Sequence, residues 1–178
     1  RYPDRPSRAR PPAVLDRLSQ VSLPSDQMYS VTKRIEFCYG HRLLDYDGVC
    51  KHPHGHNAIA EIEVLTTALD ERDMVCDFSD IKRVVKDWVD RELDHKMILR
   101  RDDPLVEPLR VLGESVYLVD SNPTVECLAQ LIHQQAKASG LPVVRVTVCE
   151  TPSSYATYSE PSPDVVAKAS ASTAIGSD

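Results

Sequence analysis

The 178-residue chain lacks paired cysteines, long apolar runs and an excess of basic residues, and each absence argues against a class of protein. Its five cysteines form no Cys-x-x-Cys pair, so the spacing of a structural zinc site built from cysteines is missing. An odd number of scattered thiols favours a reducing, cytoplasmic setting over a disulfide-linked secreted domain. No apolar stretch is long enough to span a bilayer or to form a signal-peptide core, so we expect no membrane partner.

Basic residues are the minority, with 21 Lys and Arg against 27 Asp and Glu, which gives a net charge of −6. The arginines of residues 1–25 therefore predict a solvated arm, and we expect no nucleic-acid partner. Residues 1–25, rich in Arg and Pro, and residues 161–178, rich in Ala and Ser, show little apolar periodicity and are expected to be flexible tails. The length and the 42% hydrophobic content favour a single domain over residues 26–160.

Periodicity within residues 26–160 predicts a small α+β domain. A helix capped by Asp77 has apolar residues at helical spacing, and a second helix begins at Asn122 as its N-cap and ends at Gly140. Residues 100–120 are expected to form a loop and a short strand. The predicted fold class is α+β, a four-stranded antiparallel sheet with two helices packed on one face. Its four strands are expected at residues 28–37, 57–69, 143–150 and 154–158.

Three histidines near the first two strands predict a metal site, and Cys50 supplies a thiol beside it. His54 and His56 would point to the same side of an extended segment, and imidazole is a preferred zinc ligand. His41 ends an alternating run that should form the neighbouring strand, so it is the best third ligand, although His52 could compete. Three protein ligands leave one coordination position open, as in catalytic zinc sites. The alternative is that these are polar loop histidines.

Six motifs occur in order over residues 29–158. They are Phe37-x-x-x-His41, Cys50-x-x-x-His54-Gly55-His56-Asn57, Met74-Val75-x-Asp77-Phe78, Leu93-Asp94-His95, Asn122-Pro123-Thr124-x-Glu126 and Cys149-Glu150-Thr151. On these motifs the chain resembles the 6-pyruvoyltetrahydropterin synthase and 6-carboxytetrahydropterin synthase family. The three-residue gap between Cys50 and His54 resembles that of the 6-carboxytetrahydropterin branch, which serves 7-deazaguanine (queuosine-type) biosynthesis.

The resemblance implies an assembly, a substrate and a cofactor. The family has the tunnelling fold, in which sheets join edge to edge into a barrel of three subunits, and two trimers stack into a homo-hexamer with active sites between subunits. The implied substrate is 7,8-dihydroneopterin triphosphate, which is converted to 6-carboxytetrahydropterin with loss of triphosphate and acetaldehyde. The implied cofactor is Zn²⁺, held by His41, His54 and His56, where it would polarise oxygens of the substrate.

The same resemblance implies roles for five further residues. Cys50 would be the base, with His95 as its proton-transfer partner and Asp94 orienting His95 through a carboxylate–imidazole contact. Glu150, at the end of an apolar strand, would accept hydrogen bonds from the pterin ring, and Thr124 would contact the same ring. Each residue also has a simpler interpretation. Cys50 could be an ordinary loop cysteine, and Asp94 with His95 a polar pair at a helix end. Glu150 could be a solvated carboxylate at a strand end, and Thr124 a threonine at a helix start.

Two other functions stay open at this point. A 6-pyruvoyltetrahydropterin synthase would share the elimination of triphosphate but not the cleavage of the side chain. A zinc-stabilised protein without catalytic activity could use the same fold to hold a pterin, although it would have no need of a proton-transfer set. Cys38-Tyr39-Gly40 stands where relatives usually have small residues, which bears on the shape of the pocket. The basic partner of the triphosphate is not separable among Lys33, Arg34, Arg42 and Lys51.

Overall fold

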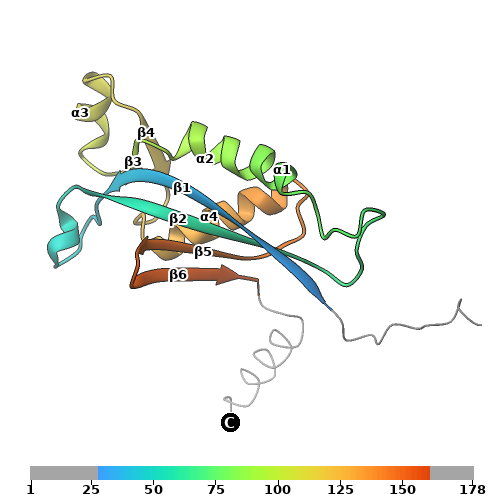
Figure 1. The fold of residues 1–178 in the computed structure, drawn as a ribbon. Helices are drawn as coiled ribbons and strands as arrows, with labels where there is room; N and C mark the ends of the chain where they lie inside the picture. Colours follow the sequence, from blue (N-terminus) through green and yellow to red (C-terminus); the bar gives the residue numbers. More distant parts are fainter. Residues whose placement is uncertain (1–27, 161–178) are drawn as a thin grey trace, which may run out of the picture.

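The computed structural model describes residues 28–160, and the two predicted tails, 1–25 and 161–178, lie outside the described residues. Within the described part, six strands form one mixed sheet in the order β4-β3-β1-β2-β5-β6 (Figure 1). None of the helices in residues 28–160 is long and apolar enough to cross a membrane. The strands are β1 (Tyr29–His41), β2 (His54–Thr66), β3 (Lys96–Arg100), β4 (Val116–Val119), β5 (Val143–Thr151) and β6 (Ser154–Ser159).

An antiparallel unit of four strands makes up only part of this sheet. Strands β1, β2, β5 and β6 pair antiparallel in that order, whereas β3 pairs parallel to β1 and β4 pairs parallel to β3. The prediction of a four-stranded antiparallel sheet is therefore wrong. β3 and β4 are only five and four residues long, too short for a two-residue alternation to be recognised in the sequence. The short strand expected within residues 100–120 is β4.

The long β1–β2 ladder carries the histidines at one end. All 13 residues of β1 pair with β2, and the ladder ends at the pair His41–His54. β1 thus runs past its predicted end at residue 37, and β2 begins before its predicted start at residue 57. Side chains alternate along each strand, so every second residue faces the core. On β1 these residues are Ile35, Phe37, Tyr39 and His41, and on β2 they are His54, His56, Ala58, Ala60 and Ile62.

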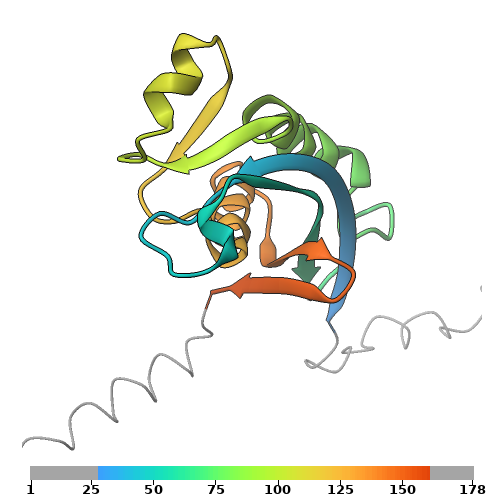
Figure 2. The ribbon, with the colours of Figure 1, turned by 90° about the vertical axis from the view of Figure 1, so that its left-hand side faces the viewer.

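Two helical segments pack on this face of the sheet. α1 (Phe78–Ile81), η3 (Lys82–Lys86) and α2 (Asp87–Glu92) follow one another, and the curled sheet wraps around α4, Val125–Ala138 (Figure 2). Asp77 caps α1, as predicted, by accepting the Ser79 N–H at 2.7 Å. α4, however, begins after Thr124, whose hydroxyl accepts the Cys127 N–H, so the prediction of Asn122 as N-cap is wrong. The inward helix residues include Ile81, Val85, Trp88, Val89, Leu128, Ile132 and His133.

A short helix that the sequence did not predict connects β3 and β4. α3 spans Val106–Val111 and stands away from the main body of the sheet (Figure 1). It contains Pro108, which argues against a helix in a sequence reading but is tolerated in a first turn, where the backbone N–H has no partner within the helix. Val111 and Leu112, at its end, are 83% and 75% exposed.

Candidate metal centre and adjoining cavity

Three imidazoles converge at the end of the β1–β2 ladder. His41 lies directly opposite His54 in the ladder, and His56 follows on the same face two positions along β2. One ring nitrogen of each lies within 4.8 Å of the others. His41 is 4% exposed and the other two are half-buried. The strand pairing therefore creates the cluster, because it sets three side chains from two chain segments on one face.

Backbone carbonyls fix which nitrogen of His41 and of His54 carries the proton. Nδ1 of His41 is 2.7 Å from the carbonyl oxygen of Pro123, and Nδ1 of His54 is 2.8 Å from that of His52. A carbonyl oxygen can only accept, so each Nδ1 must be the protonated donor. In the neutral rings each Nε2 then holds a lone pair, and the two Nε2 atoms lie 3.1 Å apart. Two lone pairs at that distance repel each other unless a cation or a proton lies between them.

His56 adds a third nitrogen that lacks a partner. Its Nε2 is buried and makes no hydrogen bond within residues 28–160. Burial also lowers the pKa of His41 below its ordinary value, which favours the neutral form that can bind a metal. Neutral imidazoles whose other nitrogen bonds to a backbone carbonyl are typical metal ligands. The donor set of His41, His54 and His56 therefore fits a divalent metal ion such as zinc.

Glu150 brings a carboxylate to the same place from the end of β5. Its Oε1 is 3.8 Å from Nε2 of His41 and 3.9 Å from Nε2 of His56. The same oxygen accepts a hydrogen bond of 2.5 Å from the hydroxyl of Tyr39. Burial, with help from the neighbouring Glu150 carboxylate, raises the pKa of Tyr39, so the phenol stays protonated. In the sequence Tyr39 stood out only for its size. Its hydrogen bond to Glu150 joins residues 111 positions apart, so no local sequence pattern predicts it.

A cavity of about 310 Å³ joins these groups to Cys50 and Thr124. Cys50 belongs to η2 (Val49–Lys51), a single turn in the loop between β1 and β2. Thr124 uses its hydroxyl oxygen as the N-cap of α4, but the hydroxyl proton is free to face a ligand. The structure thus brings together six of the eight residues singled out in the sequence. This histidine cavity is lined by His41, Cys50, His54, His56, Thr124 and Glu150, together with Leu43, Val125 and Glu126.

Asp94 and His95 do not line the histidine cavity. His95 Nδ1 lies 2.8 Å from Asp94 Oδ2, and Asp94 Oδ1 accepts the Cys38 N–H at 2.8 Å. Although burial opposes it, the Cys38 N–H and the imidazole hold the pKa of Asp94 below its usual value. The pair adjoins the side chain of Cys38, whose Sγ lies within 4.8 Å of ligand-type atoms of both residues and which alternates along β1 with the core-facing residues. The pair therefore belongs to the opposite face of the sheet from the three histidines.

The backbone of His95 also marks a constrained position. His95 has a φ of 56°, in the left-handed region that few residues other than glycine adopt. Its N–H donates to the carbonyl of Cys38 at 2.7 Å, which ties the end of α2 to β1. The Sγ of Cys38 lies within 4.8 Å of ligand-type atoms of both Asp94 and His95. Sequence reasoning missed this proximity, since Cys38 and Asp94 are 56 positions apart.

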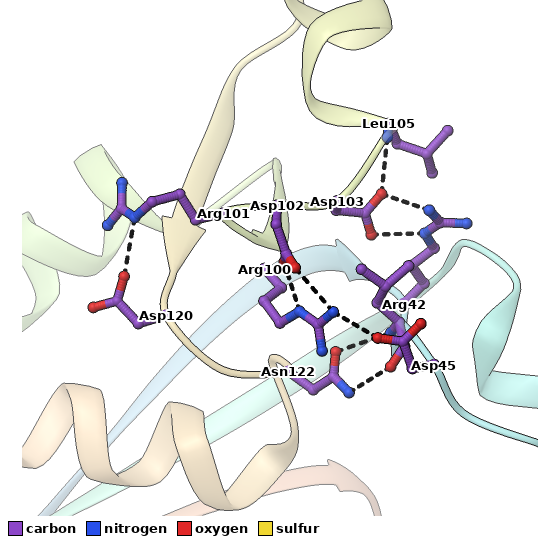
Figure 3. A network of polar contacts seen from close by, with 10 residues as sticks. Arg42, Asp45, Arg100, Arg101, Asp102, Asp103, Leu105, Asp120 and Asn122 are labelled. Atoms are coloured by element: carbon purple, nitrogen blue, oxygen red, sulfur yellow. Dashed lines mark hydrogen bonds and ion pairs between the residues drawn. The ribbon is translucent and has the colours of Figure 1, made fainter.

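A polar network holds the loop that leads from His41 to Cys50 (Figure 3). Arg42 donates two hydrogen bonds, of 2.7 and 2.5 Å, to the carboxylate of Asp103, which is 3% exposed. The side-chain amide of Asn122 bonds to both the N–H and the carbonyl of Leu44, at 2.9 and 2.8 Å. Asn122 therefore fastens this loop to the start of α4 rather than capping the helix. Arg100 adds a contact of 2.7 Å to Asp45.

The structure separates the four basic candidates for the triphosphate. Arg42 is committed to Asp103, and Arg34 lies 3.3 Å from Glu61. Nζ of Lys33 lies over the ring of Phe78, at the far end of β1. Lys51 is exposed, directly follows Cys50 and makes no ion pair within residues 28–160. Lys51 is thus the one of these four that is the chain neighbour of a cavity residue, Cys50, and has no acidic partner among the described residues.

Comparison with known proteins gives these residues a family context. The chain matches the family model described as 6-pyruvoyl tetrahydropterin synthase over residues 30–161. A Rickettsia bellii protein named 6-carboxy-5,6,7,8-tetrahydropterin synthase is 33% identical over 135 residues, covering 72% of this chain and 98% of that protein. A Rickettsia felis protein of the same name is 38% identical over 104 residues, covering 57% and 75%.

Solved structures show the same fold. An uncharacterized protein from Wolinella succinogenes superposes with a TM-score of 0.64 at 26% identity, covering 76% of this chain and 99% of that one. The 6-pyruvoyl tetrahydropterin synthase of Caenorhabditis elegans superposes with a TM-score of 0.58 at 22% identity, covering 76% and 97%. At that identity the second likeness concerns the fold alone.

Proposed function

The chain belongs to the 6-pyruvoyl tetrahydropterin synthase family, and we propose that it is a 6-carboxytetrahydropterin synthase. Its reaction would convert 7,8-dihydroneopterin triphosphate to 6-carboxytetrahydropterin, with loss of triphosphate and acetaldehyde. The observation that carries the proposal is the histidine cavity, where three imidazole nitrogens, a thiol and a carboxylate meet. The relatives named for the carboxy product are also closer in sequence than the solved structures named for the pyruvoyl product.

Zinc is the cofactor that the three-histidine set fits. Bound at His41, His54 and His56, it would supply Lewis-acid polarisation of an oxygen on the substrate side chain. The protein's own contribution is to orient the imidazoles, because the carbonyls of Pro123 and His52 hold the Nδ1–H groups and leave each Nε2 to face the metal. Burial of His41 also excludes water from one side of the site.

Cys50 is the proposed base, and Asp94 with His95 the proposed proton-transfer pair. Cys50 accepts a proton from a carbon of the substrate side chain, which requires the thiolate form. His95 can supply or remove the proton that activates the thiol, and Asp94 holds its imidazole in one orientation. Because the pair lies on the opposite face of the sheet from the histidine cavity, Cys50 of one copy would work with Asp94 and His95 of another.

This division supports an oligomeric enzyme. The described sheet has two edge strands, β4 and β6, whose outer backbone groups are available to pair with another copy. Joined in this way, three copies would close a barrel and two barrels would stack into a homo-hexamer. The exposed Val111 and Leu112 of the α3 segment offer further apolar surface for such contacts.

Glu150 and Thr124 are the proposed contacts of the pterin ring. The ring presents an N–H and an amino group side by side, and a carboxylate can accept from both. Thr124 keeps a hydroxyl proton with which to donate to a ring acceptor. Lys51 is the proposed contact of the triphosphate, since it is exposed beside Cys50. We further propose a cytoplasmic enzyme of 7-deazaguanine (queuosine) biosynthesis, in keeping with five free cysteines.

Product analysis tests the proposal directly. Purified, zinc-loaded protein is incubated with 7,8-dihydroneopterin triphosphate, and the pterin is identified by mass spectrometry while acetaldehyde is trapped and measured. A 6-carboxy product with one acetaldehyde per turnover is the expected result. A pyruvoyl product without acetaldehyde would assign the sister activity instead. Binding of the substrate without any turnover would indicate a pterin-binding protein without catalytic activity.

A further inference from the structure

The ring of Tyr39 lies beside those of His41 and His56, and its hydroxyl contacts one of the two carboxylate oxygens of Glu150. Its hydroxyl donates to Oε1 at 2.5 Å, and that oxygen also faces the Nε2 atoms of His41 and His56. Within residues 28–160, Oε2 of Glu150 accepts no hydrogen bond. Glu150 is therefore fastened by one oxygen, with the other left for a ligand.

We infer that Tyr39 is a positioning residue, which fixes the carboxylate of Glu150 in the orientation that recognises the ligand. The inference rests on the proposed function, in which Glu150 binds the pterin ring. Tyr39 itself need not touch the ligand. The ligand class is a flat ring with two adjacent hydrogen-bond donors, since each carboxylate oxygen has two lone pairs and Oε1 can accept from the ring as well as from Tyr39.

The tyrosine ring is held on both sides, so its hydroxyl has a defined position. The ring stacks on Phe37 with centroids 5.5 Å apart and meets the edge of His41 at 5.1 Å. All three side chains come from alternate positions of β1, the central part of the sheet. A side chain on a strand has a better defined position than one on a loop. Through its hydrogen bond, Tyr39 therefore restricts the position of the Glu150 carboxylate.

The direction of the hydrogen bond is also fixed. The phenol O–H of Tyr39 donates, and the carboxylate oxygen of Glu150 accepts. A glutamate side chain has several rotatable bonds, and holding it before the ligand arrives reduces the entropy lost on binding. A small residue at position 39 could not reach Glu150, so the oxygen would have to find its orientation during binding.

The test separates positioning from general packing. Tyr39→Phe removes only the hydroxyl, Glu150→Ala removes its partner, and the double variant closes a double-mutant cycle. Tyr117→Phe is the matched control, because Tyr117 also packs edge-on against an aromatic ring, that of Trp88, but lies away from the histidine cavity. The probe is 7,8-dihydroneopterin, whose dissociation constant is measured for each zinc-loaded protein, together with zinc content, kcat and KM for the triphosphate substrate.

Tyr39→Phe should bind dihydroneopterin about 10-fold more weakly, the lower end of the range for a hydrogen bond to a charged group. KM should rise in parallel while kcat and zinc content stay near the wild-type values, since the bond serves binding rather than the chemical step. In the Glu150→Ala background the same substitution should change binding by less than twofold. An equal loss in both backgrounds, an unchanged affinity or a loss of zinc from Tyr39→Phe would each overturn the inference.

The outcome is distinguishable from failure of the proposed function. If the wild-type protein binds no dihydroneopterin, the function fails, and the same four proteins are then compared by urea unfolding. Coupling between Tyr39 and Glu150 of about fivefold or more in the unfolding constant would uphold the positioning of the carboxylate for some other ligand. Coupling below twofold would overturn the inference as well. If the wild-type protein binds dihydroneopterin and Tyr39→Phe binds it equally well, the proposed function stands and the positioning role of Tyr39 is overturned.

Discussion

Replacing Asp103 by alanine should destabilise the protein strongly, because it leaves the neighbouring guanidinium of Arg42 without its partner. The Asp103 side chain is 1% exposed and that of Arg42 is 17% exposed. Removing one partner of a buried ion pair costs about 3–5 kcal/mol. Arg42 can still reach water through its exposed part, so we expect the lower end, about 3 kcal/mol. Asp103 also accepts the Leu105 N–H at 2.8 Å, a bond that is lost too.

Urea unfolding at fixed protein concentration measures this loss. With a slope of about 2 kcal/mol per molar urea, the midpoint should fall by about 1.5 M. Asp103→Asn, which keeps an acceptor and the shape, is the control and should lose less. Because Arg42 directly follows His41, zinc affinity should fall as well, by about tenfold, as it does when outer contacts of a metal site are removed. A midpoint change below 0.25 M would refute the reasoning.

The same pair predicts a pH dependence. Although burial opposes it, the guanidinium of Arg42 holds the pKa of Asp103 below its ordinary value of 3.8. The stability that the pair contributes is therefore present in full above that value and is lost as the pH falls through the lower pKa of the folded state. The urea midpoints of wild-type and Asp103→Ala should thus differ by a constant amount near neutrality and converge in strong acid. A difference that grew on acidification would contradict this account.

The wild-type protein should bind about one zinc per chain, and His54→Ala and His56→Ala should each lose zinc and activity together, as measured by metal analysis and turnover. Full zinc content in both variants would refute the ligand assignment. Cys50→Ala should keep its zinc while kcat falls about 10²-fold, and near-normal turnover would remove it as the base. Lys51→Gln should raise KM for the triphosphate substrate a few-fold but leave the affinity for dihydroneopterin unchanged; an equal effect on both would exclude a triphosphate contact. His133 is buried against Tyr158 with neither ring nitrogen bonded within residues 28–160, and burial lowers its pKa below 6.5. The fold therefore favours its neutral form, so wild-type stability should fall as the pH drops below about 6.5, and His133→Leu, compared by thermal unfolding, should remove that part of the slope.

The sequence was most informative where a local pattern determines geometry. The two-residue spacing of His54 and His56 and the alternating run that ends at His41 sufficed to place three side chains on one face, because a strand allows little else. The contact between Asp94 and His95 was also local. Their position on the opposite face was not predictable, since it depends on how the end of α2 meets Cys38, 56 positions away.

Tertiary partners account for the parts that could not be predicted. Asn122 has the residue type of an N-cap, but its amide bonds to Leu44, and Thr124 caps the helix two residues later. β3 is defined by its parallel pairing with β1 rather than by any pattern of its own. Tyr39 looked only like a bulky departure before His41 until the fold brought Glu150 to its hydroxyl. The assembly, the metal and the residue roles stay predictions.

Cys50 and the Asp94–His95 pair line different cavities, and this has a genetic consequence. If one subunit supplies the thiol and another the imidazole, loss of either group damages a different half of each shared site. A chain with Cys50→Ala and a chain with His95→Ala would each be inactive alone, yet each would keep what the other has lost. Co-expressed in one cell, the two defective alleles should complement each other, because some mixed interfaces would unite an intact thiol with an intact imidazole.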